Sequence, residues 1–326
     1  MTNIYILDTP YHLFITIVKT MLSNRIGLDT VIITRDYIPQ ETIQNAKKIF
    51  KEVICDVGRI CSLKKIFWLK LQQKNIPFIS KKIKTRFTTF GFPKDSVFYI
   101  FYDNSYFGCW LNISKTYYNL IEDGLNHFKG EMIKTTKMKI YDFLYKLIGI
   151  YWNYGGYSEY IKSIEVNENN DLRIKHDNII VKNRAKMFEK LTIKDINTIA
   201  NIFNYHPLNK EDSGNKTLLL TQPLSEDSII SHIAKIKLYQ YLVNNYSIGT
   251  LYIKVHPREK ENYSKLFPNA IILGNQNVPF EIYLLKENFH FNRAITAFST
   301  AIDAVFCADE KISMGSEWVI NFSKSH

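Results

Sequence analysis

Short apolar runs alternate with helical patterns along most of the chain, and no other feature of the sequence constrains the fold as strongly. The first part has strand-like runs at residues 4–7, 30–34 and 52–55, with helical patterns at 13–22 and 37–51 between them. Strands separated by helices form βαβ units, in which the strands run parallel and the helices cover the faces of the sheet. The sequence therefore predicts an α/β fold with parallel sheets.

The same alternation begins again in the second part of the chain. Further strands are expected at 96–102, 117–121, 217–221, 251–255, 270–273 and 291–298, and further helices at 63–74, 135–150, 185–203, within 225–245, at 278–285 and after residue 299. Residues 204–216, with Pro207 and Asp212-Ser-Gly214, have the composition of a linker. A chain of 326 residues also exceeds the usual size of one hydrophobic core. We predict two Rossmann-like domains, residues 1–208 and 209–326, whose parallel sheets face a central cleft.

A cationic turn follows one of the strands of the second part. Residues 251–255 form the apolar run, and Lys254, His256 and Arg258 place potential positive charge at its carboxyl end, where Pro257 fixes the turn. Open parallel sheets bind their ligands at the carboxyl ends of the strands. The turn is therefore a candidate site for an anion, above all a phosphate. A turn histidine with solvated neighbours is the alternative.

An acidic turn follows a strand of the first part. Glu122 and Asp123 come directly after the run at 117–121 and precede Gly124, a residue that permits turns other residues resist. Neighbouring carboxylates raise each other's pKa, which makes a carboxylate a usable general base. An ordinary acidic turn or helix cap explains the same residues without chemistry.

Three more groups of polar residues are expected at strand ends of the second part. They are Gln222, Ser225, Glu226 and Asp227, of which Ser225 is expected to begin a helix; Glu281 in the first turn of a helix that starts at Pro279; and Ser299 with Thr300 at a strand-to-helix junction. A carboxylate in a first turn can accept ribose hydroxyls, and hydroxyls at a helix N-terminus bind phosphate. Helix capping and the helix dipole are the alternative explanation.

Motifs for metals and common cofactors are absent from the sequence. It contains no GxGxxG, P-loop, HExxH or Asp-x-Asp pattern, and the spacing of its four cysteines does not suit a metal. We therefore expect no metal and no cofactor.

The net charge of +11 points to an anionic partner. Residues 57–94 combine lysines and arginines with aromatic and aliphatic residues and contain no acidic residue. This mixture is typical of a surface that docks on anionic lipid headgroups, and a solvated basic face is the alternative. The chain has no run of 18 or more apolar residues and no basic N-terminal region of a secretory signal. We expect a cytoplasmic protein, peripheral at the inner face of the cell membrane.

The order of these motifs resembles the bacterial CMP-sialic acid-dependent sialyltransferases. The acidic Glu122-Asp-Gly turn precedes Lys254-x-His-Pro, then Pro279-x-Glu and Ser299-Thr. Within that group, Thr9-Pro-Tyr-His12 and Leu220-Thr-Gln-Pro-Leu224 are most similar to glycosyltransferase family 52, which includes lipooligosaccharide and capsule sialyltransferases. The resemblance spans nearly the whole chain but is diffuse over the basic segment and residues 125–210.

The resemblance implies a GT-B fold, inversion at the anomeric carbon and no requirement for a metal. It assigns Asp123 as the base, tuned by Glu122, with Asp227 as the rival, and His256 as the general acid or electrostatic stabiliser. It implies that Lys254, Pro257, Glu281, Ser299, Thr300, Gln222, Gly124 and His12 bind substrates, and His12 with Tyr11 either faces the acceptor or packs at the first turn.

The implied partners are a CMP-sugar donor and a galactose-terminated acceptor glycan, joined through an α-2,3 linkage, and the resemblance also allows a homodimer. A polysialyltransferase or a transferase for another nucleotide sugar has much of the same layout. A nucleic-acid-binding protein would explain the charge but leaves the acidic motifs unexplained, and no nucleic-acid-binding signature is visible. A protein that binds a nucleotide without catalysis is the remaining alternative.

Overall fold

The computed structural model describes residues 1–55, 92–93, 95–103, 105–124, 128, 155–207, 214–273, 277–287, 289–305 and 307–325. The chain forms two compact units, Met1–Leu191 and Thr192–His326. The division lies before the boundary predicted after residue 208, because helix α8 (Ile193–Ile202) packs against α11 (Phe280–Glu287) of the second unit. The predicted helices at 63–74 and 135–150, and nearly all of the basic segment 57–94, lie outside the described residues.

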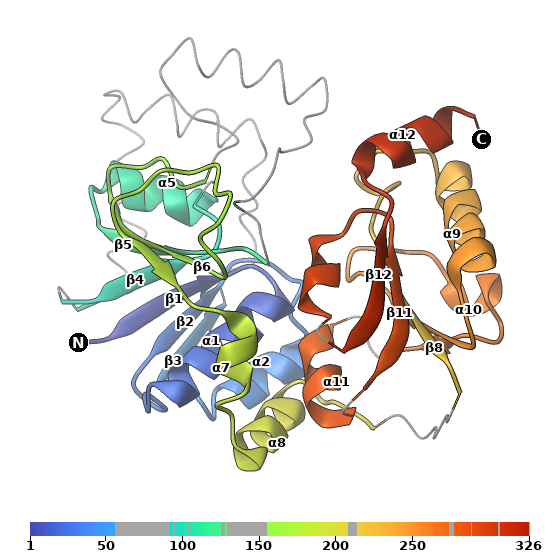
Figure 1. The fold of residues 1–326 in the computed structure, drawn as a ribbon. Coiled ribbons are helices and arrows are strands. Elements are labelled where there is room, and N and C mark those ends of the chain that lie inside the picture. The colour runs from blue at the N-terminus through green and yellow to red at the C-terminus, as the bar shows by residue number, and fades with distance from the viewer. Residues whose placement is uncertain are drawn as a thin grey trace, which may run out of the picture. The chain divides into compact units, whose positions relative to one another are not determined.

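The first unit is built on a seven-stranded sheet with the strand order β3-β2-β1-β4-β5-β6-β7 (Figure 1). Its strands are β1 (Asn3–Leu7), β2 (Thr30–Ile33), β3 (Glu52–Cys55), β4 (Val97–Ile100), β5 (Tyr118–Ile121), β6 (Ile161–Val166) and β7 (Ile179–Val181). The described helices of this unit are α1 (Pro10–Leu22), α2 (Gln40–Ala46), α5 (Tyr106–Ile113) and α7 (Arg184–Phe188). All neighbouring strands run parallel, and their apolar side chains form the core.

The second unit has a five-stranded sheet with the order β10-β9-β8-β11-β12. Its strands are β8 (Lys216–Leu220), β9 (Thr250–Lys254), β10 (Ile271–Ile272), β11 (Phe291–Thr296) and β12 (Ala308–Ser313), all parallel. Besides α8 and α11, the unit has α9 (His232–Tyr246), α10 (Tyr263–Leu266), the short 3-10 helix η1 (Thr300–Ala304) and α12 (Ser316–Lys324). Among the described helices of both units, none is long and apolar enough to cross a membrane.

The predicted fold class, two Rossmann-like domains with parallel sheets, is confirmed. In each sheet the first strand of the unit lies in the interior and the winding reverses beside it, between β1 and β4 and between β8 and β11. The carboxyl ends of strands at such a reversal are where open α/β sheets bind ligands. The topology therefore brings the predicted turns after β1, β5, β8, β9 and β11 to the functional edge of their own sheet.

Some predicted helices differ in extent from the observed ones. The helix at 185–203 is two helices, because Thr192 caps α8 through a reciprocal capping box with Asp195. The helix at 37–51 reduces to Gln40–Ala46, since Pro39 forces the residue before it out of the helical region and so sets its start.

The helix expected from Ser225 begins only at His232. Ser228 has a positive φ of 57°, a conformation that a helix interior does not contain, and Ser231 is the residue that caps α9. Strand β6 was not predicted because Lys162, Ser163 and Glu165 interrupt its apolar residues. The carboxylate of Glu165 is buried between Lys19 and Arg184. The pattern also missed α5, β7, α10, β12 and α12.

Gly249, in the turn between α9 and β9, is required by the backbone around it. It has a φ of +63°, and a Cβ there would lie 1.8 Å from the carbonyl oxygen of Asn215. Gly249→Ala is expected to destabilise the protein by about 2 kcal/mol or more, measured by urea unfolding. Gly315→Ala is the control, because Gly315 has a φ of +84° but open space around its Cβ position. Equal losses in the two variants would contradict the argument from overlap.

Candidate functional site

The first group of predicted residues lies after β1 in the first unit. Thr9 is the N-cap of α1 and Pro10 is the first helical residue, so the helix begins directly at the sheet edge. The Thr9 hydroxyl oxygen accepts the backbone N–H of His12 at 3.2 Å. The imidazole of His12 stacks on Phe101, which follows β4, with ring centroids 4.2 Å apart. His12 is therefore buried and held at a fixed position where β1 meets β4.

His12 supports Asp123, the residue predicted to be the base. Its Nδ1 accepts the backbone N–H of Asp8 at 3.1 Å, so the ring proton lies on Nε2. Nε2 lies 2.7 Å from Oδ1 of Asp123 and donates to it. The side chain of His12 is 1% exposed, whereas that of Asp123 is 36% exposed. The pair thus presents a carboxylate at the surface with an imidazole fixed behind it.

Glu122 points into the protein rather than beside Asp123. Its two carboxylate oxygens accept the backbone N–H groups of Phe128, at 3.4 Å, and Asn167, at 2.7 Å. Gly124 has a φ of +81° and completes the turn. These contacts give Glu122 a role in shaping the acidic turn. Its effect on the pKa of Asp123 stays a prediction.

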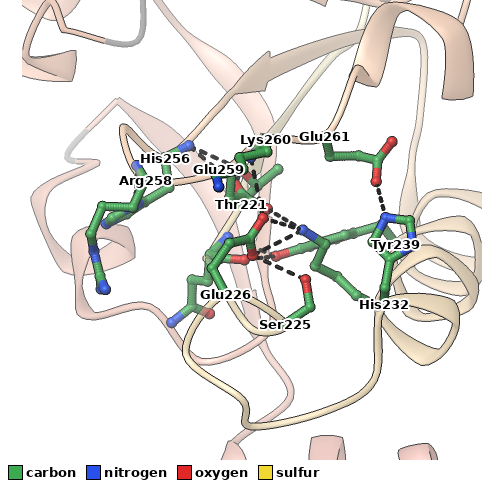
Figure 2. Close-up of polar contacts among 12 residues, drawn as sticks. Thr221, Ser225, Glu226, His232, Tyr239, His256, Arg258, Glu259, Lys260 and Glu261 are labelled. Carbon is green, nitrogen blue, oxygen red and sulfur yellow. Dashed lines mark hydrogen bonds and ion pairs between the residues drawn. The ribbon is translucent and has the colours of Figure 1, made fainter.

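The second group lies at the edge of the second sheet, where His256 follows β9 (Figure 2). Its backbone N–H donates to the Thr221 hydroxyl at 3.1 Å and to Glu259 Oε2 at 3.3 Å, and its carbonyl accepts the N–H of Glu259 at 3.0 Å. Its Nδ1 accepts the N–H of Arg258 at 3.2 Å. With Nδ1 occupied as an acceptor, the proton of the neutral ring lies on Nε2, which makes Nε2 a hydrogen-bond donor.

Burial lowers the pKa of His256 to about 4, and the charges of Arg258 and Lys254 act in the same direction against Asp227 and Glu226. We predict that NMR titration finds this midpoint near pH 4, and that Arg258→Gln raises it. In the unfolded chain the His256 ring takes up its proton near its usual pKa of 6.5. The folded state therefore loses stability as the pH falls from 6.5 through 4. A midpoint near 6.5 in the folded protein would contradict the prediction.

Lys254 and Glu281 are both buried near the His256 turn, and the charge of each affects the pKa of the other. Lys254 Nζ donates to the carbonyl of Val278 at 2.8 Å and lies 5.7 Å from the ring centroid of Tyr283. Burial lowers the pKa of Lys254 to about 8, with the charge of Glu281 opposing the shift. Burial also raises the pKa of Glu281, against its own backbone N–H and the charge of Lys254. Both side chains therefore lie in an environment that disfavours their charged forms.

Gln222 and Ser299 lie where β8 and β11 end. The Gln222 side-chain oxygen accepts the N–H of Phe298 at 2.9 Å, which ties the two strand ends together. Ser299 caps η1 by accepting the N–H of Ala301 at 3.2 Å, and Thr300 is the first residue of that helix. The structure thus brings these predicted residues to one sheet edge, and the capping explanation of Ser299 also holds.

Asp227, the predicted rival base, forms a bidentate ion pair with Arg258. Its Oδ2 lies 2.9 Å from one guanidinium nitrogen, and its Oδ1 pairs with the other. Both side chains are partly exposed, and the adjacent Pro257 is exposed as well. The pair joins the loop after β8 to the turn after β9, and it holds the carboxylate of Asp227 against a cation.

Sequence reasoning named Glu226 but missed the rest of a largely buried polar network beneath the His256 turn. It consists of Thr221, Glu226, Lys235, Tyr239, Glu259 and Tyr263. Lys235 and Tyr239 lie on the buried face of α9 among Ala234, Leu238 and Leu242, and a lysine on an apolar helical stripe was the signal available in the sequence. Within the described ranges, no group of three His, Cys, Asp or Glu side chains could hold a metal ion.

Known proteins resemble this chain in fold and over part of its sequence. The model of glycosyltransferase family 52 matches residues 45–312. A 2,6-sialyltransferase from Photobacterium sp., solved with CMP and lactose, is similar in fold with a TM-score of 0.57 at 12% identity. The match covers 96% of this chain and 71% of the Photobacterium chain. A UDP-GlcNAc 2-epimerase from Neisseria meningitidis, solved with UDP-GlcNAc, has a TM-score of 0.55 at 14% identity, covering 98% of this chain and 90% of its own. An uncharacterized protein of Haemophilus influenzae is 44% identical over 88 residues, which span 27% of this chain and only 28% of that relative.

Proposed function

Because the chain belongs to glycosyltransferase family 52, we propose that this glycosyltransferase moves sialic acid from CMP-sialic acid to the terminal galactose of a surface glycan. The proposed reaction inverts the anomeric carbon, forms an α-2,3 linkage and requires no metal. CMP and lactose in the similar Photobacterium enzyme support a CMP-sugar donor and a galactose-terminated acceptor. The observation that carries the proposal is the His256 turn, which presents a hydrogen-bond donor at the ligand-binding edge of the second sheet.

In the proposed reaction the leaving group carries a charge that fixed hydrogen-bond donors can stabilise. Cleavage of a CMP-sugar releases a nucleoside monophosphate, and the single phosphate gains charge as the bond breaks. Donors fixed before the reaction stabilise that charge without reorganising. We propose that Nε2 of His256 donates to this phosphate, assisted by Lys254 and by the hydroxyls of Ser299 and Thr300. The pKa of His256 near 4 supports donation from a neutral ring in the free enzyme.

Glu281 is proposed to hold the ribose of the donor. Its carboxylate lies in the first turn of α11 and is buried with Lys254, and burial raises its pKa. Ribose hydroxyls would satisfy the carboxylate oxygens as they enter this environment. Gln222 and Pro257 complete the proposed donor side through the backbone that they fix.

Asp123 is proposed to deprotonate the acceptor hydroxyl. The contact with His12 Nε2 orients the carboxylate, and its partial exposure leaves room for a substrate. The bidentate pairing of Asp227 with Arg258 supports this choice, because the guanidinium occupies both carboxylate oxygens and leaves them less accessible to an acceptor hydroxyl. His12 would then act behind Asp123, and Gly124 would shape the turn.

Incubation with CMP-sialic acid and a panel of galactose-terminated acceptors tests the proposal directly. Product mass reports sialyl transfer, linkage analysis distinguishes 2,3 from 2,6 and 2,8 products, and a parallel reaction with EDTA tests metal independence. UDP-GlcNAc is the comparison donor. Transfer from UDP-GlcNAc but not from CMP-sialic acid would overturn the donor assignment. Products that carry several sialic acid residues in a row would favour a polysialyltransferase.

A role at the inner membrane face in capsule or lipooligosaccharide synthesis is part of the proposal. It rests on the basic segment 57–94 of the sequence. Flotation with anionic and with neutral vesicles tests the contact, and equal recovery on both would count against it. Light scattering of the purified chain would report whether it is a homodimer.

A further inference from the structure

Glu259 lies at the centre of the buried network beneath the His256 turn (Figure 2). Its side chain is 0% exposed. One carboxylate oxygen accepts the hydroxyl of Thr221 and the backbone N–H of His256, the latter at 3.3 Å. The other accepts the hydroxyl of Tyr263 at 2.5 Å and faces Lys235 Nζ at 3.5 Å. A buried carboxylate is costly unless it is hydrogen-bonded and paired, and these contacts provide both.

Lys235 connects Glu259 to the loop after β8. Its side chain is 1% exposed, and Nζ donates to both oxygens of Glu226, at 3.0 and 3.1 Å. Glu226 in turn accepts the hydroxyl of Ser225 at 3.0 Å and the backbone N–H of Lys260 at 3.2 Å. The three linked side chains Glu226, Lys235 and Glu259 therefore hold the turn at residues 256–260 at both ends, through the N–H groups of His256 and Lys260.

Glu259 and Glu226 accept backbone N–H groups of the turn, so their contacts act on the shape of the turn itself. The N–H of Arg258 reaches Nδ1 of His256 only while the turn keeps its shape, and that contact decides which ring nitrogen carries the proton. Glu259 closes the turn twice, through its backbone N–H to the His256 carbonyl at 3.0 Å and through its carboxylate to the His256 N–H.

We infer that Glu259, backed by Lys235 and Glu226, is a positioning residue that fixes the His256 ring with its proton on Nε2. The inference rests on the proposed function for its kinetic consequence, although the tautomer itself is independent of any reaction. A fixed donor contributes to transfer because a small displacement from the reacting atoms is costly in rate.

The first test reads the His256 ring directly, without substrate. Long-range ¹H–¹⁵N spectra at pH 7 are expected to show His256 as the Nε2-protonated form in the unaltered protein. Glu259→Gln, which keeps the shape but not the charge, is expected to add a measurable share of the Nδ1-protonated form. Glu261→Gln is the matched control. Glu261 lies two residues after Glu259 but pairs with the exposed His232 instead. An unchanged His256 signal in Glu259→Gln would overturn the inference.

The second test asks whether Glu259 acts through His256. Glu259→Gln is expected to lower kcat by about tenfold to a hundredfold with little change in KM for CMP-sialic acid, because Lys254 and Glu281 remain in place. In a His256→Ala background the same substitution should change kcat by less than about twofold. A full additional loss in that background would show a merely structural role and overturn the inference.

Two variants keep the tests decisive if Glu259→Gln fails to fold. Thr221→Val removes the hydroxyl that accepts the His256 N–H, whereas Thr221→Ser keeps a hydroxyl at this position. The valine variant is expected to show the same tautomer change as Glu259→Gln, and the serine variant to keep the tautomer of the unaltered protein. A tautomer change in a protein that shows no sialyl transfer would support the positioning inference while refuting the proposed function.

Discussion

Replacing Asp123 with asparagine is expected to lower kcat for sialyl transfer by about 10²- to 10⁴-fold, the range that a general base contributes. The substitution changes little else, because the amide oxygen of asparagine can still accept the Nε2 proton of His12. The asparagine cannot take a proton from the acceptor hydroxyl. KM for CMP-sialic acid is expected to stay within about threefold, since the proposed donor residues lie in the second unit.

Asp227→Asn separates the two candidate bases. It breaks the bidentate pair with Arg258 next to the His256 turn, so a loss of up to about tenfold is expected from disturbed geometry. Steady-state kinetics of both variants, with thermal unfolding as a check on folding, decide the question. If Asp123→Asn kept most of its turnover and Asp227→Asn lost it, the base would be Asp227.

His256→Ala carries the other large expected effect, a fall in kcat of about 10²- to 10³-fold. Removing one fixed donor to the charge of a transition state typically has this consequence. The truncated side chain leaves the backbone N–H of residue 256 and its contacts with Thr221 and Glu259 in place. The measured quantity is kcat for transfer from CMP-sialic acid, with CMP binding followed separately by calorimetry.

The chain supplies a matched control for this variant. His206 precedes Pro207 just as His256 precedes Pro257, but it is exposed and follows α8 rather than a strand. His206→Ala is expected to leave kcat unchanged. Equal losses in the two variants would refute the assignment of the phosphate donor to His256.

The strand-end motifs were predictable because the alternation of strands and helices decides which loops share a sheet edge. His256 and Asp123 each follow a short apolar strand, so local pattern alone placed them at the functional edges. The support behind them was not predictable. His12 reaches Asp123 across 111 residues of sequence, and Lys235 reaches Glu259 across 24, so neither pairing leaves a local signal.

Some errors came from polar residues inside secondary structure. Strand β6 was missed because Lys162, Ser163 and Glu165 interrupt its apolar residues. A carboxylate normally argues against burial, and Lys19 and Arg184, from distant elements, make the burial of Glu165 tolerable. Ser225 looked like a helix cap, and the positive φ of Ser228, which delays the helix to His232, cannot be inferred from residue type.

The partial exposure of Asp123 has a consequence for the cycle of the enzyme. In the proposed transfer, the acceptor hydroxyl loses its proton to Asp123 and CMP leaves with the electrons of the broken bond, so every turnover ends with one proton left on the base. That proton must reach water before the next acceptor can react. A base enclosed like His12, which is 1% exposed, would keep it, whereas a carboxyl group that is 36% exposed can release it directly to solvent.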